Sequence, residues 1–220
     1  MADLVTFDCY GTLVDFDLNR VVRGILKERL RIDGVEEAEF LRDFRVMRFQ
    51  AVLEDYRPYR QLLCETLERA MRLHGMPYRK ADGDALVAAV PTFGPFHEVP
   101  GVLTKLKTNY QIAIISNTDD DLIRGSVARI GVDFDFVITA EQARAYKPQR
   151  AAFDFALRTA GRAADQVIHV AQGFEYDIMP THGLGMRRIW INRRGRRGSS
   201  AFMPYEELPD MSRLPALLGV

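Results

Sequence analysis

Asp8 is the residue of this sequence whose surroundings most clearly suit chemistry. It comes directly after the apolar run Leu4–Phe7 and is followed by Gly11 and Thr12. Because open α/β sheets place their chemistry at the carboxyl ends of the strands, a carboxylate here is a candidate nucleophile. The glycine permits a tight turn, and the threonine hydroxyl can hydrogen-bond a carboxylate or a bound anion. The structural alternative is an Asp that caps the next helix.

Three more polar sites follow apolar runs and could join Asp8. Ser116 and Asn117 end one run, Lys147 precedes a proline, and Asp177 comes shortly after another run. A lysine near Asp8 would keep that carboxylate ionised, and Asp177 could accept a hydrogen bond from the lysine and orient it. Each residue alone also fits an ordinary role, such as a turn, a solvated surface lysine or a helix-terminal carboxylate. Jointly they favour an active site.

Apolar runs that alternate with helical patterns predict the elements that position these residues. The expected strands are Leu4–Phe7, Ile112–Ile115, Phe136–Thr139, Val167–Val170 and Ile189–Ile191. The expected helices between them are Asp120–Ile130, Gln149–Ala160 and Asp177–Leu184. Strands alternating with helices indicate βαβ units and a parallel sheet. His169, inside one of these strands, is expected to be a packed residue and not a catalytic base.

Residues 17–91 break this rhythm, because they are predicted to form one helix after another. The expected helices are Leu18–Arg31, Glu36–Leu53, Tyr59–His74 and Asp84–Val90. We therefore expect an α/β fold with a Rossmann-like parallel sheet and an inserted helical cap. The core would comprise residues 1–16 and 92–220, and the cap residues 17–91.

The composition is that of an ordinary globular protein and excludes several classes. The 220 residues include 47% hydrophobic side chains, and 30 basic residues balance 30 acidic ones. Zero net charge argues against a nucleic-acid partner. There is no secretory leader pattern and no apolar run of about 18 residues, so no membrane partner is expected. Two cysteines suit a reducing compartment, and we expect a cytoplasmic protein.

Four motifs in this order resemble those of the haloacid dehalogenase superfamily over nearly the whole chain. The resemblance implies that Asp8 is the nucleophile of the first motif. Ser116, Lys147 and Asp177 would supply the second, third and fourth motifs. The helical insert resembles the family's cap, which lies between the first and second motifs.

Two departures from the phosphatases of this superfamily indicate which of its branches the sequence resembles. Tyr10 stands where they carry a second Asp that acts as general acid. The pair Ala171-Gln172 stands where they carry Gly-Asp to help hold Mg²⁺, and Glu175 would be the alternative metal ligand. We therefore expect no metal and no cofactor. The Asp-x-Tyr-Gly-Thr-Leu pattern resembles the L-2-haloacid dehalogenases, in which Asp8 would form an ester that water hydrolyses to a 2-hydroxy acid.

The resemblance also implies a cap arginine over the departing halide, just after an aromatic residue. Phe44-Arg45 is the best match, and Arg48 is the alternative one helical turn further along. Tyr59 and Phe93 could form an apolar wall of the pocket, although core packing explains them equally well. The expected ligand is a small carboxylate.

Other positions differ from well-known dehalogenases. Gln172-Gly173-Phe174 replaces a Ser-Ser-Asn-type run, and Phe153 replaces a tyrosine six residues after Lys147. Gln172 could orient water through its amide, and Phe174 is expected to contact substrate. The alternatives are a hydrolase of another small electrophile, a phosphatase, and a non-catalytic binding module. A homodimer formed through the cap helices would suit this branch.

Overall fold

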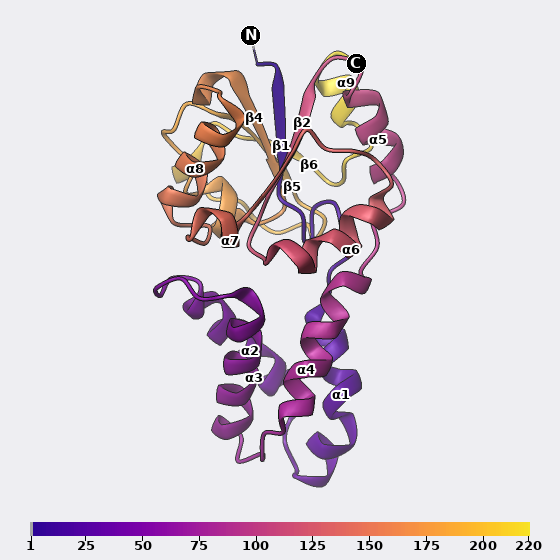
Figure 1. Cartoon of the computed structure of the whole chain (residues 1–220), viewed down its shortest axis with the longest axis vertical. Helices are drawn as coiled ribbons and strands as arrows, with labels where there is room; N and C mark the ends of the chain where they lie inside the picture. The colour runs from indigo at the N-terminus through magenta and orange to yellow at the C-terminus, as the bar shows by residue number, and fades with distance from the viewer. Residues whose placement is uncertain (1) are drawn as a thin grey trace.

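The protein, described over residues 2–220 by a computed structural model, is built around one six-stranded parallel sheet (Figure 1). Its strands are β1 (Leu4–Phe7), β2 (Gln111–Ser116), β3 (Phe136–Thr139), β4 (Val167–Ala171), β5 (Arg187–Ile191) and β6 (Glu206–Leu208). Their spatial order is β3-β2-β1-β4-β5-β6. The expected α/β fold class is thereby confirmed.

Strand β1 lies at the centre of this sheet, and all four of its residues are buried. Leu4 pairs with Gln111 of β2 on one side and with Val167 of β4 on the other. A strand buried on both faces is expected to be continuously apolar, as Leu4–Phe7 largely is. Because all the strands are parallel, the carboxyl ends of β1, β2 and β4 meet at one edge of the sheet.

Helices cover both faces of the sheet and also form a separate group. Helices α1 (Leu18–Ile32), α2 (Glu37–Ala51), α3 (Tyr59–Leu73) and α4 (Lys80–Ala89) pack on one another and form what we call the helical unit. It lies at the end of the molecule opposite the two chain termini (Figure 1). The remaining helices are α5 (Val99–Leu106), α6 (Asp120–Ile130), α7 (Ala140–Ala143), α8 (Arg150–Ala160) and α9 (Leu214–Leu217).

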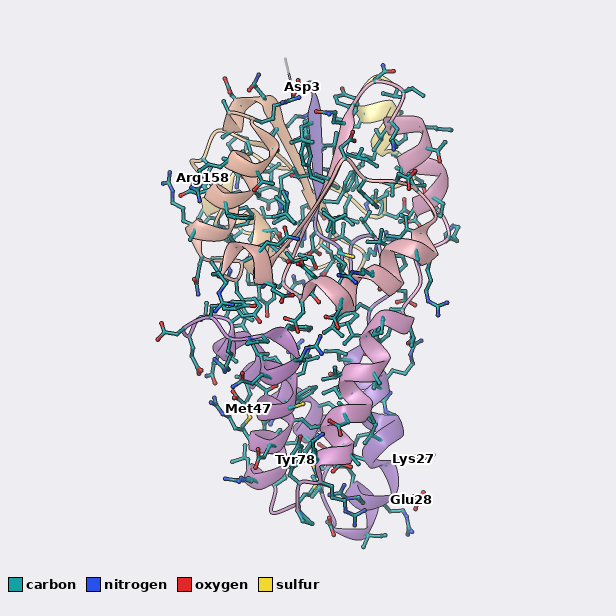
Figure 2. The ribbon with its side chains drawn as sticks, viewed as in Figure 1. Asp3, Lys27, Glu28, Met47, Tyr78 and Arg158 are labelled. Atoms are coloured by element: carbon teal, nitrogen blue, oxygen red, sulfur yellow. The ribbon has the colours of Figure 1, made fainter. Side chains whose placement is uncertain are left out.

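Side chains explain why the helical unit holds together. In α1, Asp17 accepts a hydrogen bond from the Arg20 backbone N–H, and the buried residues recur every four positions from Leu18 to Leu30. This spacing gives an amphipathic helix with one apolar stripe. Figure 2 labels Met47 and Tyr78 within the unit, and Lys27 with Glu28 near its far end. Asp3 and Arg158 mark the part that contains the sheet (Figure 2).

Some expected elements differ in the structure. The helix expected over Asp177–Leu184 is wrong: a single π-helical turn spans Phe174–Ile178, and irregular turns follow it. Pro180 has no N–H to continue a helix, which accounts for the break. Helix α4 begins at Lys80 and not at Asp84, because the Asp82 carboxylate accepts a hydrogen bond from the Arg79 N–H at 3.0 Å and starts the helix earlier.

Two kinds of element were not expected from the sequence. Helices α5, α7 and α9 are short, and strand β6 is the three-residue edge strand Glu206–Leu208. A half-exposed edge strand needs no apolar run, so the pattern that reveals central strands is missing. None of the helices within residues 2–220 has both the length and the apolar character needed to cross a membrane.

Candidate active site

Asp8 lies at the carboxyl end of β1, and each of its carboxylate oxygens has a donor. Lys147 Nζ donates to Oδ1 at 2.9 Å, and Thr12 Oγ1 donates to Oδ2 at 2.7 Å. The backbone N–H of Asp8 donates to the Val170 carbonyl of β4 at 3.1 Å. The carboxylate is therefore held in one orientation while its side chain remains 12% exposed.

The Lys147 ammonium group is fully used. Besides Asp8, it donates to Asp177 Oδ1 at 2.7 Å and to the Ile115 carbonyl at 2.8 Å. Three acceptors match the three N–H donors of a charged lysine. Its side chain is only 2% exposed, so the ammonium charge is balanced by two carboxylates in a buried setting.

Asp177 is itself supported from the β4 strand. His169 Nε2 lies 3.0 Å from Asp177 Oδ1, and His169 Nδ1 lies 2.8 Å from Thr6 Oγ1 of β1. The ring is fully buried and also meets Phe153 edge-on, with centroids 5.7 Å apart. Asp177 Oδ2 is buried and has no hydrogen-bond partner among the described residues.

Burial and charge shift the pKa values of this group in different directions. Burial raises the pKa of Asp8, an effect that Lys147 opposes and the Asp177 charge reinforces. Burial also acts to raise the pKa of Asp177, but Lys147 and His169 outweigh it and lower that pKa. Burial acts to lower the pKa of Lys147, yet Asp177 and Asp8 raise it above its usual value. At neutral pH the lysine therefore remains charged.

Ser116 and Asn117 end the neighbouring strand β2 and have different roles. Asn117 Nδ2 donates to the Lys147 carbonyl, and the Lys147 N–H donates to Asn117 Oδ1, both at 2.7 Å. This reciprocal pair fixes the backbone that carries the lysine. Ser116 Oγ is buried without a hydrogen-bond partner in the described chain, so it is free to bind a ligand.

Two glycines allow the active-site loops to approach closely. Gly11 has a φ of +89°, and a Cβ there would lie 3.0 Å from Gln172 Oε1. A Cβ on Gly173 would lie 2.5 Å from Asp177 Oδ2, which is too close for any real Cβ. The backbone N–H of Gln172 donates to Thr12 Oγ1 at 2.8 Å and so ties the end of β4 to the loop after β1.

A cavity of about 260 Å³ opens over this edge of the sheet. From the sheet side it is lined by Asp8, Tyr10, Ser116, Asn117, Lys147, Gln172 and Asp177, all expected from the sequence. The helical unit contributes Arg45 and Arg48 from α2 and Tyr59 from α3. The Arg48 guanidinium lies over the Phe44 ring, 4.6 Å from its centroid. Both candidate arginines thus line the same cavity.

Tyr10 faces an aromatic cluster. Its ring stacks on Phe16 with centroids 4.2 Å apart, and Phe93 meets Phe16 at 4.8 Å. Burial raises the pKa of Tyr10, so its phenol stays protonated at neutral pH. Phe93 does not line the cavity itself but supports Phe16, which does.

The structure places two expected residues elsewhere. Phe174 packs against Trp190 at a centroid distance of 4.9 Å and does not line the cavity, so its expected contact with substrate is wrong. The π-helical turn brings Tyr176 to the cavity instead. Glu175 pairs with Arg196 at 3.3 Å and lies outside the cavity lining.

Sequence reasoning missed several lining residues, notably Phe16, Asn19, Tyr176 and Arg194. Tyr176 precedes the expected helix Asp177–Leu184, and no motif pointed to it. Arg194 belongs to a basic loop after β5 to which no function was assigned from the sequence. Only the position of that loop at the carboxyl end of β5 could have indicated it, since such loops border α/β sites.

The helical unit is attached to the sheet beside the cavity. The Asp119 carboxylate, which follows the Ser116–Asn117 pair, accepts hydrogen bonds from the backbone N–H groups of Tyr59 at 2.6 Å and Arg60 at 3.0 Å. It therefore caps the first turn of α3 from another part of the chain. Tyr146 donates to the Arg57 carbonyl at 2.7 Å and adds a second attachment.

Comparison with known proteins agrees with this geometry. Residues 2–180 match the family of haloacid dehalogenase-like hydrolases, so the chain belongs to that family. It is 26% identical over 217 residues to (S)-2-haloacid dehalogenase 4A from Burkholderia cepacia, covering 97% of this chain and 93% of that one. It is also 26% identical over 211 residues to (S)-2-haloacid dehalogenase from Pseudomonas sp. strain YL, covering 94% and 88%. A solved L-2-haloacid dehalogenase superposes with a TM-score of 0.85 at 21% identity, covering 100% and 99% of the chains.

Proposed function

We propose that this protein hydrolyses the carbon–halogen bond of small (S)-2-haloacids. An oxygen of the Asp8 carboxylate attacks C2, a C–O bond forms, and the halide leaves with the electron pair of the C–X bond. Water then attacks the carbonyl carbon of the Asp8 ester. The ester C–O bond to Asp8 breaks, the 2-hydroxy acid leaves, one proton is released, and Asp8 becomes a carboxylate again.

The observation that carries this proposal is the combination of Asp8 and Tyr10 in one cavity. Asp8 is positioned by Lys147 and Thr12 as a nucleophile. Tyr10, two residues on, is a neutral phenol stacked on Phe16 and supplies no carboxylic acid. A phosphate monoester needs its leaving alcohol protonated, whereas a halide departs as a stable anion. The site therefore suits a leaving group that needs no general acid.

Charges around the cavity support both steps. Ser116 Oγ has no partner among residues 2–220 and can donate to the substrate carboxylate. Arg45 of α2 is the candidate to stabilise the departing halide, which makes the helical unit a cap over the reaction. For the second step, Asp177 Oδ2 is a free acceptor for a proton of the attacking water. Gln172 lines the same cavity and can orient that water through its amide.

The residues at the site do not fit the Mg²⁺ ion used by phosphatases of this superfamily. Mg²⁺ requires oxygen ligands, usually carboxylates, in near-octahedral geometry. Asp177 directs Oδ1 to Lys147 and His169, Gln172 stands in place of an acid, and Glu175 pairs with Arg196. The described residues contain no group of three or more His, Cys, Asp or Glu side chains arranged to hold a metal. We propose that the positive charges of lysine and arginine stabilise the negative charges that the reaction involves.

Halide release from (S)-2-chloropropionate, with and without EDTA, tests the proposal. We expect chloride and lactate in equal amounts, no effect of EDTA, and loss of turnover in Asp8→Asn. Single-turnover reaction in ¹⁸O-water should place ¹⁸O in the Asp8 carboxylate, detected by mass spectrometry. Mg²⁺-dependent phosphate release without chloride would establish a phosphatase, and a 2-hydroxy acid formed without halide from another substrate would indicate a different electrophile.

We also propose that the helical unit forms a homodimer interface. Four of the exposed large hydrophobic residues lie on it, namely Ile32, Val46, Leu53 and Leu73. Light scattering during size-exclusion chromatography measures the mass directly. A mass near the 25.1 kDa of one chain would rule the dimer out.

A further inference from the structure

The cavity is lined by three arginines, although the proposed reaction assigns a task to only one of them. The minimal machinery is Asp8, Asp177, Lys147 and one arginine, whose charges cancel. The cavity is lined in addition by two more arginines and by Asp17. The described residues that line the cavity then carry a net charge of +1, which the C1 carboxylate of a 2-haloacid balances as a whole, while two of the three arginines still have no assigned partner.

The three cavity arginines also differ from their neighbours, because they form no ion pair with any residue that the structure describes. Arg42, one turn before Arg45, pairs with Glu39 at 3.3 Å. Arg193 and Arg196, on either side of Arg194, pair with Glu98 and Glu175. Within residues 2–220, by contrast, no acidic side chain lies within ion-pair distance of these three arginines, Arg45, Arg48 and Arg194.

Arg48 is the least solvated of the three. Its Nε is buried without a hydrogen-bond partner in the described chain, and its guanidinium is held over the Phe44 ring. It also lies against the phenol of Tyr59. Burial raises the pKa of that phenol, and the Arg48 charge acts to lower it. A buried guanidinium N–H without an acceptor is costly, so a ligand that supplies an acceptor gains binding energy.

The size of the cavity agrees with a ligand larger than a three-carbon acid. Its volume of about 260 Å³ is close to the lower end of the roughly 300–1,000 Å³ range of pockets that hold drug-sized ligands. A 2-halopropionate has only six non-hydrogen atoms and leaves much of this space unfilled. The unfilled volume and the arginines without ion-pair partners lie in the same cavity.

We propose that the preferred substrate is a 2-halodicarboxylic acid whose second carboxylate binds Arg48, with Arg194 lining the same cavity. This inference rests on the proposed function and specifies its substrate class. Arg45 remains the candidate for the halide, and Arg48 becomes a specificity-determining residue. A guanidinium suits this task because its planar N–H groups match both oxygens of a carboxylate.

A comparison of the turnover of two substrates tests this assignment. Chloride release is measured from (S)-2-chlorosuccinate and (S)-2-chloropropionate in the wild type, Arg48→Gln and Arg42→Gln. We expect kcat/KM to favour chlorosuccinate in the wild type. Arg48→Gln should reduce that preference by roughly tenfold or more, the loss expected for a charge-assisted hydrogen bond. The control Arg42→Gln changes an exposed arginine of the same helix and should retain the preference for chlorosuccinate.

The outcomes separate the two proposals. Chloride from chloropropionate without preference for chlorosuccinate would overturn the dicarboxylate assignment and leave the dehalogenase proposal standing. An equal loss for both substrates in Arg48→Gln would place Arg48 at the common part of the substrate and also overturn it. If neither substrate gives chloride, the binding of succinate and propionate is compared by calorimetry. Tighter binding of succinate that is lost in Arg48→Gln would support a second carboxylate site at Arg48. Equal binding of the two acids would reject that site.

Discussion

At the scale of single residues, Lys147 links the two carboxylates Asp8 and Asp177 of the site. Its ammonium group contacts Asp8, Asp177 and a backbone carbonyl in surroundings almost closed to solvent. Removing one partner of such a buried pair leaves an uncompensated charge, which costs about 3–5 kcal/mol. The same buried setting makes the charge states, and so the activity, depend on pH.

The loss of activity at low pH should reflect protonation of the Asp8 carboxylate. Burial raises its pKa above the usual value of 3.8, and only the ionised carboxylate is a nucleophile. We therefore expect kcat/KM to fall as the pH decreases through a value above 3.8. Lys147, whose pKa is raised, stays charged and causes no loss below its usual value of 10.5. Initial rates between pH 4 and 10 at constant ionic strength, roughly the range in which most proteins stay folded, measure this. A flat profile across the acid range would contradict it.

His169 should matter although it does not line the cavity. The substitution His169→Leu removes one of the donors that lower the pKa of Asp177 and leaves Thr6 without its ring partner. Because a hydrogen bond to a charged group contributes about 1.5–3 kcal/mol, we expect kcat to fall roughly tenfold or more with KM little changed. Steady-state kinetics give the split between kcat and KM. Thr6→Val, which removes only the outer partner, should have a smaller effect, and an equal effect would mean that both act through folding.

At the scale of elements, the first turn of α3 depends on a residue from the sheet side. Pro58, the residue before this helix, offers no side-chain cap, and Asp119 supplies the acceptors instead. Helix α3 carries Tyr59 into the cavity at this same turn. Attachment of the helical unit and the shape of the cavity are therefore linked.

Asp119→Ala should consequently affect both stability and substrate binding. Loss of an N-terminal cap costs about 0.5–2 kcal/mol, and we expect a lower Tm together with a raised KM. Thermal unfolding and steady-state kinetics on the same preparations measure the two effects. Asp121→Ala is the matched control, because within residues 2–220 the ion-pair partner of Asp121 is the exposed side chain of Arg60. If both variants behave alike, the cap does not shape the cavity.

The sequence was informative where a physical pattern is strong and local. Apolar runs located the central strands, and the residues at their ends predicted Asp8, Ser116, Lys147 and Asp177. The sequence pattern was not informative where tertiary contacts determine the position of a residue. Phe174 lies away from the cavity because a π-helical turn shifts the register after β4. Asp119 could not be recognised either, since its role as a cap requires knowing that α3 begins next to it.

At the scale of the whole molecule, the attachments between the helical unit and the sheet predict one cooperative unfolding step. Trp190, the only tryptophan, is 1% exposed in β5 and reports on the sheet. Far-ultraviolet circular dichroism reports largely on the helices. We expect the two denaturation curves to coincide, as in a two-state transition. A circular dichroism change that precedes the tryptophan signal would show instead that the helical unit melts separately.

The central position of β1 has a consequence for how the chain folds during synthesis. Strand β1, which Asp8 follows, is synthesised well before its partners, which begin at Gln111 and Val167. Contacts this distant in sequence form slowly, because the intervening chain must first be ordered. The end of the sheet that carries the site is thus completed only after β4 and Asp177 have been synthesised. Until Gln111–Ser116 has been synthesised β1 is an apolar strand without a partner, and until Val167–Ala171 follows it can pair on one side only.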